Sequence, residues 1–165
     1  MDILSGHAFI FGDDIDIDEI LPRRYLNTVS PSEYPAHCME DVDPDFARRV
    51  KPGDIIVAGK NFGVGTGRGQ AATALKGCGL SCIIAKNFGR IFFRNTINMG
   101  LPAIECPEAF GAVNQGDVLE IQMKKHCIVN KTKSEVYQFE AFPPMITTLL
   151  ESGGLMEAIK QGKLK

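Results

Sequence analysis

The sequence predicts a single α/β domain with a β-rich C-terminal portion, and three observations carry that prediction. An apolar run at 55–58 is followed by a glycine-rich loop, a helical pattern and a second apolar run at 81–86, which is the order of a β-α-β unit. Three short strand-like segments between residues 118 and 139 then follow without a helix between them. The 165 residues, 44% of them hydrophobic, suffice for one domain with a full core over 1–165.

Apolar periodicity and turn residues predict the elements of the N-terminal half. Residues 6–11 alternate weakly and predict a first strand, and two short helices are expected at 31–39 and 44–50. After the glycine loop, apolar residues recur at helical spacing and glycines end the helix: Ala71, Ala74, Leu75 and Cys78, then Gly77 and Gly79. A further helix is expected at 89–99. In the unit 54–105, a right-handed crossover would put the loop at the carboxyl end of its first strand.

The C-terminal portion predicts three strands and two helices. The strands are expected at 118–123, 127–129 and 135–139, joined by polar turns, and Pro143 and Pro144 end this part. The apolar positions expected to face inward are Met145, Ile146, Leu149 and Leu150 in the first helix and Leu155, Met156 and Ile159 in the last.

The loop after the first apolar run carries glycine at 63, 65, 67 and 69. Such alternation lets successive N–H groups turn inward and form a small nest for a carboxylate or phosphate at the helix start. Arg68 is expected in the first turn of that helix, where a cation is unfavourable unless an anion lies nearby. The alternative is a solvated Arg68 in a flexible turn. Nucleotide motifs fit poorly, because Gln70 stands where a G-x-G-x-x-G motif needs its last glycine.

Composition and charge exclude several classes of protein. The net charge of −2 gives no electrostatic reason to bind nucleic acid. No apolar stretch approaches the roughly 20 residues of a membrane span, so a cytoplasmic protein is expected. An acidic run resembles a calcium-binding loop but does not match its pattern, because Glu19 and Tyr25 stand where that loop needs glycine and glutamate. Five cysteines without a C-x-x-C pair predict buried thiols, and no metal site is expected: Cys38, Cys78, Cys82, Cys106 and Cys127.

The histidines carry no predicted chemistry. His37 is expected on the surface of a short helix, and neither His7 nor His126 has a supporting Asp or Cys nearby in the sequence.

The segment GKNFGVGTGRGQAATALKGCGLSCIIAKNFGRIFFRNTINMGLP resembles the signature region of the aconitase-type swivel domain. The resemblance is strongest to the small subunits of 3-isopropylmalate dehydratase and archaeal homoaconitase, and it extends to both ends of the chain. It implies a swivelling β/β/α domain that acts as a hydro-lyase only in complex with a large subunit. That large subunit would carry a [4Fe-4S] cluster, while this chain would bind no cofactor and could form a homo-oligomer when isolated.

The resemblance also implies site residues, with one departure from the family pattern. Where the family carries Ser-Ser-Arg-Glu, this chain has Thr66, Gly67, Arg68 and Gly69. Thr66 stands at the position of the catalytic base, where its β-branch restricts the side chain. Arg68, with the amides of Gly65 and Gly67, would hold a substrate carboxylate. The second hydroxyl and the glutamate of the family are missing.

Two further segments match the family on the substrate side. The run GDDIDIDEILPRRYL resembles the family's GDxIxTDxIIPxRYL, which gives Asp18 a site role and leaves Asp14 and Asp16 on a solvated strand face. Asn27 and Thr28 fall in the short loop that selects the substrate's side group. An Asn can donate and accept hydrogen bonds but cannot neutralise a distal carboxylate, although Arg23 or Arg24 could substitute.

One helical face is of open function. Arg90, Arg94 and Asn98 follow at i, i+4 and i+8, and they could face the site, a partner subunit or solvent.

Three hypotheses for function follow from these residues. The chain is the small subunit of a 3-isopropylmalate dehydratase, interconverting 2- and 3-isopropylmalate in leucine biosynthesis, or of a relative acting on another substituted malate. Alternatively it is a homoaconitase-type subunit with a tricarboxylate substrate. The third hypothesis is a non-catalytic binding or regulatory module that keeps the fold and the anion nest but has lost the Ser-Ser-Arg-Glu loop.

Overall fold

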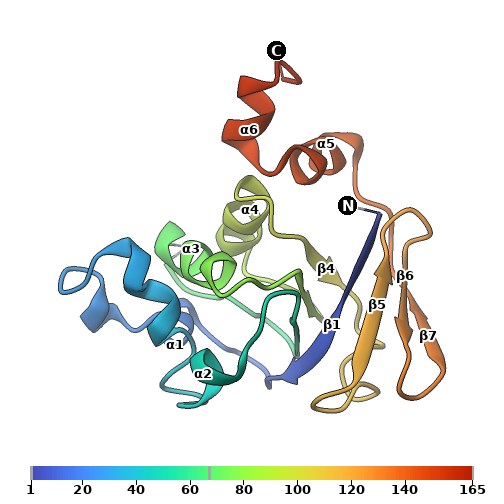
Figure 1. The fold of residues 1–165 in the computed structure, drawn as a ribbon, viewed down its shortest axis with the longest axis horizontal. Coiled ribbons are helices and arrows are strands. Elements are labelled where there is room, and N and C mark those ends of the chain that lie inside the picture. Colours follow the sequence, from blue (N-terminus) through green and yellow to red (C-terminus); the bar gives the residue numbers. More distant parts are fainter. Residues whose placement is uncertain (1, 67, 165) are drawn as a thin grey trace.

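The computed structural model describes residues 2–66 and 68–164, and its centre is one seven-stranded sheet of order β4-β3-β2-β1-β5-β6-β7 (Figure 1). Strands β1 to β4 are parallel, whereas β5 to β7 are antiparallel. Their bounds are β1 Ile3–Ile10, β2 Ile55–Ala58, β3 Cys82–Ala85, β4 Ala103–Glu105, β5 Val118–Gln122, β6 Cys127–Asn130 and β7 Glu135–Gln138. The predicted α/β class with a β-rich C-terminal portion is confirmed.

Eight helical segments connect or follow the strands in the described part of the chain. They are α1 Ile17–Ile20, the 3₁₀ helices η1 Arg23–Tyr25 and η2 Pro31–His37, α2 Phe46–Arg49, α3 Gly69–Gly77, α4 Arg90–Asn98, α5 Pro144–Ser152 and α6 Leu155–Lys160. The segment predicted as the first short helix is a 3₁₀ helix with Pro35 inside it, since proline removes an N–H that an α-helix needs. None of these helices has the length and hydrophobicity that a bilayer-spanning segment needs.

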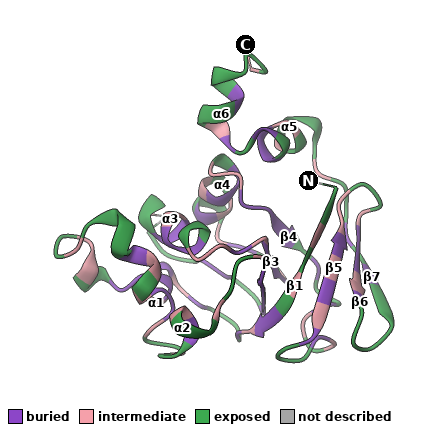
Figure 2. Ribbon diagram, in the orientation of Figure 1, coloured by how far each residue is buried: buried purple, intermediate pink, exposed green. Residues whose placement is uncertain are grey.

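Every residue of the parallel strands β2 and β3 is buried, whereas the first half of β1 alternates between exposed and half-buried residues (Figure 2). Alternate residues of a strand point to opposite faces, so Ile56 and Ile83 join a core with the helices α1 to α4 and η2. Their neighbours Ile55 and Ile84 join a second core with side chains of β5, β6 and β7. The sheet curls for this reason: its antiparallel half covers the face that the helices leave open. The thiol of Cys106, just past β4, donates to the carbonyl of Gln138 on β7 at 3.4 Å and links the two edges.

β1 belongs to both halves of the sheet. Residues Ala8 to Ile10 pair with β2 in parallel, whereas Ile3 to His7 pair with β5 in antiparallel register. The strand therefore begins three residues before the predicted start at residue 6, because a partner distant in the sequence extends it.

Two predictions about individual residues are wrong. Asp14 and Asp16 do not lie on a strand face: Asp14 has φ of +58° in the turn after β1, and Asp16 caps α1 by accepting from the N–H of Glu19 at 2.9 Å. In the last helix, Met156 and Ile159 are 64% and 52% exposed, and Ala158 is buried in their place.

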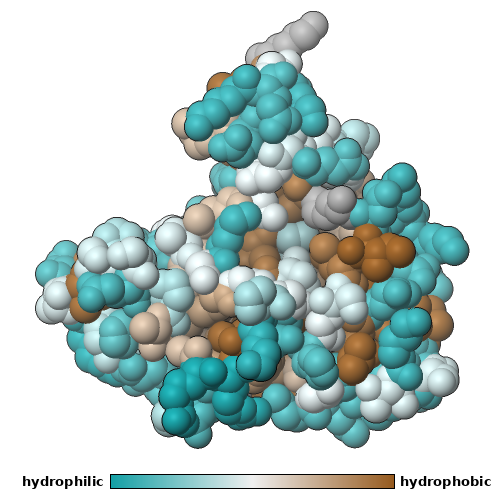
Figure 3. Space-filling model, in the orientation of Figure 1, coloured by the Kyte–Doolittle hydropathy of each residue, from teal (hydrophilic) through white to brown (hydrophobic). Residues whose placement is uncertain are grey.

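The cause lies in how the C-terminal helices sit. α5 and α6 extend away from the body of the domain, so α6 has one packed side only (Figure 1). On the face drawn in Figure 3, the surface of α6 is mostly hydrophilic, and hydrophobic side chains gather over β1 and β5. Met145 of α5, predicted inward, is likewise 60% exposed.

Candidate active site

The glycine-rich loop lies at the carboxyl ends of β1, β2 and β3, as the sequence predicts. Two backbone hydrogen bonds tie it to the segment after β1: the N–H of Gly63 donates to Ile15 at 2.7 Å and that of Ile17 to Val64 at 2.9 Å. Two more tie it to the segment after β3, between Phe62 and the residues Asn87 and Gly89 at 3.1 and 2.9 Å. The loop is therefore held on both sides, at the edge of a parallel sheet where α/β proteins bind ligands.

Glycine is required at two positions of this loop region. Gly63 has φ of +83°, and a Cβ there would lie 2.2 Å from Cγ of the Phe92 ring. A Cβ on Gly89 would lie 2.6 Å from the carbonyl oxygen of Gly63. Gly69, by contrast, has open space around its Cβ direction. The loop thus packs tightly where it passes α4 and opens outward where α3 begins.

The predicted anion nest is smaller than four alternating glycines suggest. The N–H of Gly63 donates to Ile15, and that of Val64 to Asn61 at 3.2 Å, so these two amides serve the loop itself. Gly65, with φ of +126°, and Thr66 are exposed at the tip. Gly67 lies outside the described residues. The role of Gly65 and Gly67 in holding a carboxylate and that of Thr66 as the base stay predictions.

Arg68 is the N-cap residue of α3, not a residue of its first turn. Its side chain is 21% exposed and its Nη2 donates to Oδ1 of Asp18, while Nε is buried without a hydrogen-bond partner among the described residues. The sequence predicts that a cation here needs an anion nearby, and Asp18, 50 residues earlier in the chain, is that anion. The alternative of a fully solvated Arg68 side chain is wrong.

Asp18 lies in the first turn of α1. The capping box of Asp16 and Glu19 fixes the start of this helix, and the N–H of Ile17 ties it to the glycine loop. The hydrogen bond from Arg68 and the charges of Arg68 and Arg23 lower the pKa of Asp18, although burial opposes them. Asp18 is therefore a carboxylate at neutral pH. Because its side chain is 48% exposed, it can orient Arg68 and still face a ligand.

The other predicted substrate residues lie in the turn after η1. Asn27 and Thr28 are both exposed, and the Thr28 hydroxyl donates to the carbonyl of Arg24 at 2.7 Å. Within the described residues neither makes a hydrogen bond to Arg68 or Asp18. Their contact with a substrate stays a prediction.

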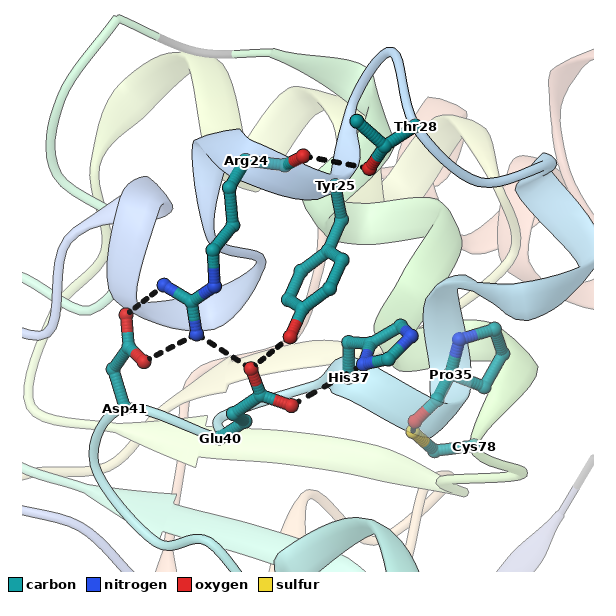
Figure 4. Close-up of polar contacts among 8 residues, drawn as sticks. All are labelled: Arg24, Tyr25, Thr28, Pro35, His37, Glu40, Asp41 and Cys78. Carbon is teal, nitrogen blue, oxygen red and sulfur yellow. Dashed lines mark hydrogen bonds and ion pairs between the residues drawn. The ribbon is translucent and has the colours of Figure 1, made fainter.

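A polar network anchors that turn, and the sequence analysis did not find it (Figure 4). Arg24 donates to both carboxylate oxygens of Asp41, at 3.2 and 2.8 Å, and to Glu40 at 2.5 Å. Glu40 also accepts from the hydroxyl of Tyr25 and contacts Nδ1 of His37 at 3.2 Å. Burial raises the pKa of Glu40, but the hydrogen bonds from Tyr25, His37 and Arg24 outweigh it, so the net pKa is lowered.

The network corrects two expectations. His37, expected on the surface of a short helix, is only partly exposed, since its ring stacks on that of Tyr25 with centroids 3.8 Å apart. Arg24 is committed to two carboxylates of its own chain, and its pKa is raised by those bonds. A signal was present in the sequence, since Arg-Arg-Tyr and Glu-Asp are complementary, but their pairing depends on the path of the chain between them.

The cysteines behave as core residues. Cys38, Cys82, Cys106 and Cys127 are buried, and burial raises the pKa of the Cys82 thiol to about 12. Cys78 is half-buried, which corrects the expectation that all five are buried, and its thiol contacts that of Cys38. Among the described residues no three His, Cys, Asp or Glu side chains form a group that could hold a metal ion.

The helical face of Arg90, Arg94 and Asn98, whose function the sequence leaves open, is exposed. Arg90, Arg94 and Asn98 are all solvent-accessible on α4. Arg90 and Arg94 line a hollow of about 340 Å³ together with Gly63, Val64 and Gly65, so the two arginines border the glycine loop.

Comparison with known proteins agrees with this geometry. Residues 13–109 match the family model described as the Aconitase C-terminal domain. The chain is 49% identical over 156 residues to the 3-isopropylmalate dehydratase small subunit of Heliobacterium modesticaldum, with 94% of each chain covered. It is 48% identical over 155 residues to the 2,3-dimethylmalate dehydratase small subunit of Eubacterium barkeri, covering 94% of this chain and 95% of the relative.

The solved structures agree as well. The crystal structure of a 3-isopropylmalate dehydratase from Methanocaldococcus jannaschii superposes with a TM-score of 0.92 at 43% identity, covering 98% of this chain and 95% of that one. The chain therefore belongs to the aconitase C-terminal domain family, among the small subunits of the 3-isopropylmalate dehydratase type.

Proposed function

We propose that this chain is the small subunit of a hydro-lyase that interconverts 2- and 3-isopropylmalate by dehydration and rehydration, in leucine biosynthesis. The observation that carries the proposal is the pair of Arg68 and Asp18 beside the glycine loop, in a chain whose relatives are dehydratase small subunits over almost their whole length. The partner would be a large subunit, since the relatives are named as small subunits.

Arg68 would bind one carboxylate of the hydroxy-acid. A guanidinium offers several donors in one plane, and here only Nη2 is held by Asp18. Asp18 would keep the guanidinium in position, and the amides of the exposed residues Gly65 and Thr66, together with Gly67, would complete the carboxylate site. Binding of this kind orients the carbon that loses its proton.

Thr66 would act as the base at the tip of the loop. A hydroxyl has a pKa far above neutrality, so the closed complex would have to lower it with positive charge and hydrogen-bond donors near the hydroxyl oxygen, against the opposing effect of burial. A [4Fe-4S] cluster on the large subunit would act as the Lewis acid for the leaving hydroxyl. The cysteines of this chain do not fit a cluster, because they are core thiols, and Cys82 keeps its proton at neutral pH.

The substrate's side group would be uncharged. Arg24, one of the two arginines that could have paired with a third carboxylate, is occupied by Asp41 and Glu40, and Arg23 lies 3.5 Å from Asp18. Asn27 and Thr28 offer neutral hydrogen-bonding groups at this turn. These contacts favour isopropylmalate over homocitrate, and the relative named 2,3-dimethylmalate dehydratase makes dimethylmalate the second candidate. Five unpaired thiols suit the reducing cytoplasm, where we expect the complex to act.

The test is anaerobic co-expression with the cluster-bearing large subunit, followed by ultraviolet detection of the unsaturated acid. The substrates are 2- and 3-isopropylmalate, 2,3-dimethylmalate and homocitrate. Arg68→Lys should raise KM by roughly tenfold or more, because Lys cannot reproduce a planar donor pair. Thr66→Val should lower kcat by roughly 100-fold or more, as loss of a base does, while Thr66→Ser should retain activity.

Two controls separate the hypotheses. Arg48→Ala removes an exposed arginine of α2 and should leave the kinetics unchanged. The variant Thr66→Ser/Gly67→Ser/Gly69→Glu restores the family's loop. The wild-type complex could assemble intact and still be inactive on all four substrates. If the restored variant then gains activity, the result would support the non-catalytic module instead.

A further inference from the structure

A small surface beside the glycine loop combines two arginines with two exposed apolar side chains. Arg90 and Arg94 are one turn apart on α4, and Val64 of the loop and Ile91 of α4 are 39% and 50% exposed. All four line the hollow of about 340 Å³ that also contains Gly63 and Gly65. We call these four residues the arginine face.

The described residues supply no ion-pair partner for the two arginines of this face. Five of the seven arginines form ion pairs with carboxylates, namely Arg23, Arg24, Arg48, Arg49 and Arg68. Arg90 and Arg94 form none within the described residues. Glu105 lines an adjoining hollow with both arginines but pairs with neither. Arg90 is also the first residue of α4, where the positive end of the helix dipole makes a cation unfavourable unless an anion comes from elsewhere.

We propose that the arginine face is a docking surface for an acidic patch of the cluster-bearing large subunit. The proposal rests on the proposed function, in which substrate held on that subunit must reach Thr66 and Arg68. Gly65, next to Thr66, lines the same hollow as the arginines, so a partner that covers the loop also covers this face. Exposed apolar residues flanked by arginine have the composition of interface cores, and unpaired guanidinium groups select carboxylates on the partner.

The test measures the affinity of this chain for the purified, cluster-loaded large subunit, under anaerobic conditions and at two salt concentrations. The variant is Arg90→Glu/Arg94→Glu. We expect its Kd to rise roughly tenfold or more at low salt, with the difference shrinking at high salt. The variant should fold normally, because Glu at the start of α4 suits the helix dipole better than Arg does. Thermal unfolding of the isolated chain checks this point.

Two matched variants act as controls. Arg48→Glu reverses an exposed arginine on α2, whose side chain is 76% exposed, and should leave the Kd unchanged. Arg90→Lys/Arg94→Lys keeps the charge and should retain most of the affinity. Replacing a contacting carboxylate on the large subunit by Lys should restore binding of the Arg90→Glu/Arg94→Glu variant.

Several results would overturn the proposal. An unchanged Kd for the Arg90→Glu/Arg94→Glu variant would contradict the docking role. If that variant has an unchanged Kd but a raised KM, the arginines contribute to substrate binding instead. Loss of self-association by the reversed variant, with normal binding to the large subunit, assigns the face to a second copy of this chain. If the wild-type chain does not bind the large subunit, both proposals fail. If it binds in a charge-dependent way but the complex shows no turnover, the docking proposal is supported and only the proposed function is contradicted.

Discussion

At the scale of single residues, the pair of Arg68 and Asp18 is the centre of the candidate site. The two residues hold each other in place: the guanidinium of Arg68 donates to Asp18, and the same carboxylate lies 3.5 Å from Arg23. A half-exposed pair of this kind contributes little to stability, but it fixes the direction of the guanidinium. Orientation, more than stability, is what a carboxylate clamp requires.

The first prediction concerns the pH dependence of the Asp18 contribution. Because Arg68 lowers its pKa in the folded state, Asp18 stabilises the fold above its unfolded pKa of about 4, and this contribution is lost as pH falls through the lowered value. Asp18→Asn should therefore cost about 1 kcal/mol or less at pH 7 and nothing at strongly acid pH. Urea unfolding of wild type and variant at both pH values measures it. An equal cost at both would contradict the assignment.

The second prediction compares two glycines of the same loop. Gly63→Ala places a Cβ against the Phe92 ring at positive φ and should cost about 2–4 kcal/mol of unfolding free energy. Gly69→Ala meets open space at the start of α3 and should be neutral or stabilise by up to about 1 kcal/mol. Chemical denaturation of the two variants gives the comparison, and similar costs would show that the loop is not packed as described.

At the scale of elements, the turn that carries Asn27 and Thr28 is held by a network and not by a regular helix. η1 has three residues, and its anchoring comes from Arg24 and Tyr25, which reach Glu40 beyond η2. Glu40 has three partners in this network, so it is the side chain on which the position of the turn depends most.

The third prediction follows from that dependence. Glu40→Ala leaves Tyr25 and His37 without their acceptor and should destabilise the protein by about 1–2 kcal/mol. Asp45→Ala removes one exposed, single ion pair with Arg48 and should change stability by less than about 0.5 kcal/mol. Thermal unfolding of both variants measures the difference. If the proposed function holds, Glu40→Ala should also raise KM while Asp45→Ala does not.

At the scale of the whole molecule, β1 joins the two halves. The helical core and the core of the antiparallel strands lie on opposite faces of one sheet, and β1 pairs with both β2 and β5. Opening either half therefore exposes the buried face of the other, which predicts cooperative unfolding.

The fourth prediction tests that cooperativity. Leu75→Ala in α3 and Leu119→Ala in β5 each remove a fully buried side chain, and each should cost about 2–5 kcal/mol in one shared transition. Val136→Ala, 53% exposed on β7, should cost less than about 1 kcal/mol. Far-ultraviolet circular dichroism and amide resonances from both halves should give coincident midpoints. Separate midpoints would mean that the halves unfold independently.

How well the sequence predicts a feature of the structure depends on how far apart in the chain the interacting residues lie. The buried strands β2 and β3, the helices α3 and α4 and the three antiparallel strands follow from local apolar patterns, and the structure confirms them within a few residues. The short elements α1 and β4 contain too few residues to show a pattern. The prediction of which residues of α6 face inward was wrong, because that depends on what α6 packs against.

The sequence by itself determined the class of fold, the place of the glycine loop after β2 and the resemblance to the dehydratase small subunits. Those features depend on residues close together in the chain, whose backbone preferences act whatever lies around them. Only the tertiary structure decided that Asp18 meets Arg68, that Arg24 is held by Glu40 and Asp41, and that Arg90 and Arg94 border the loop. The reason is physical: a contact across tens of residues depends on how the cores place whole elements, which no local pattern encodes.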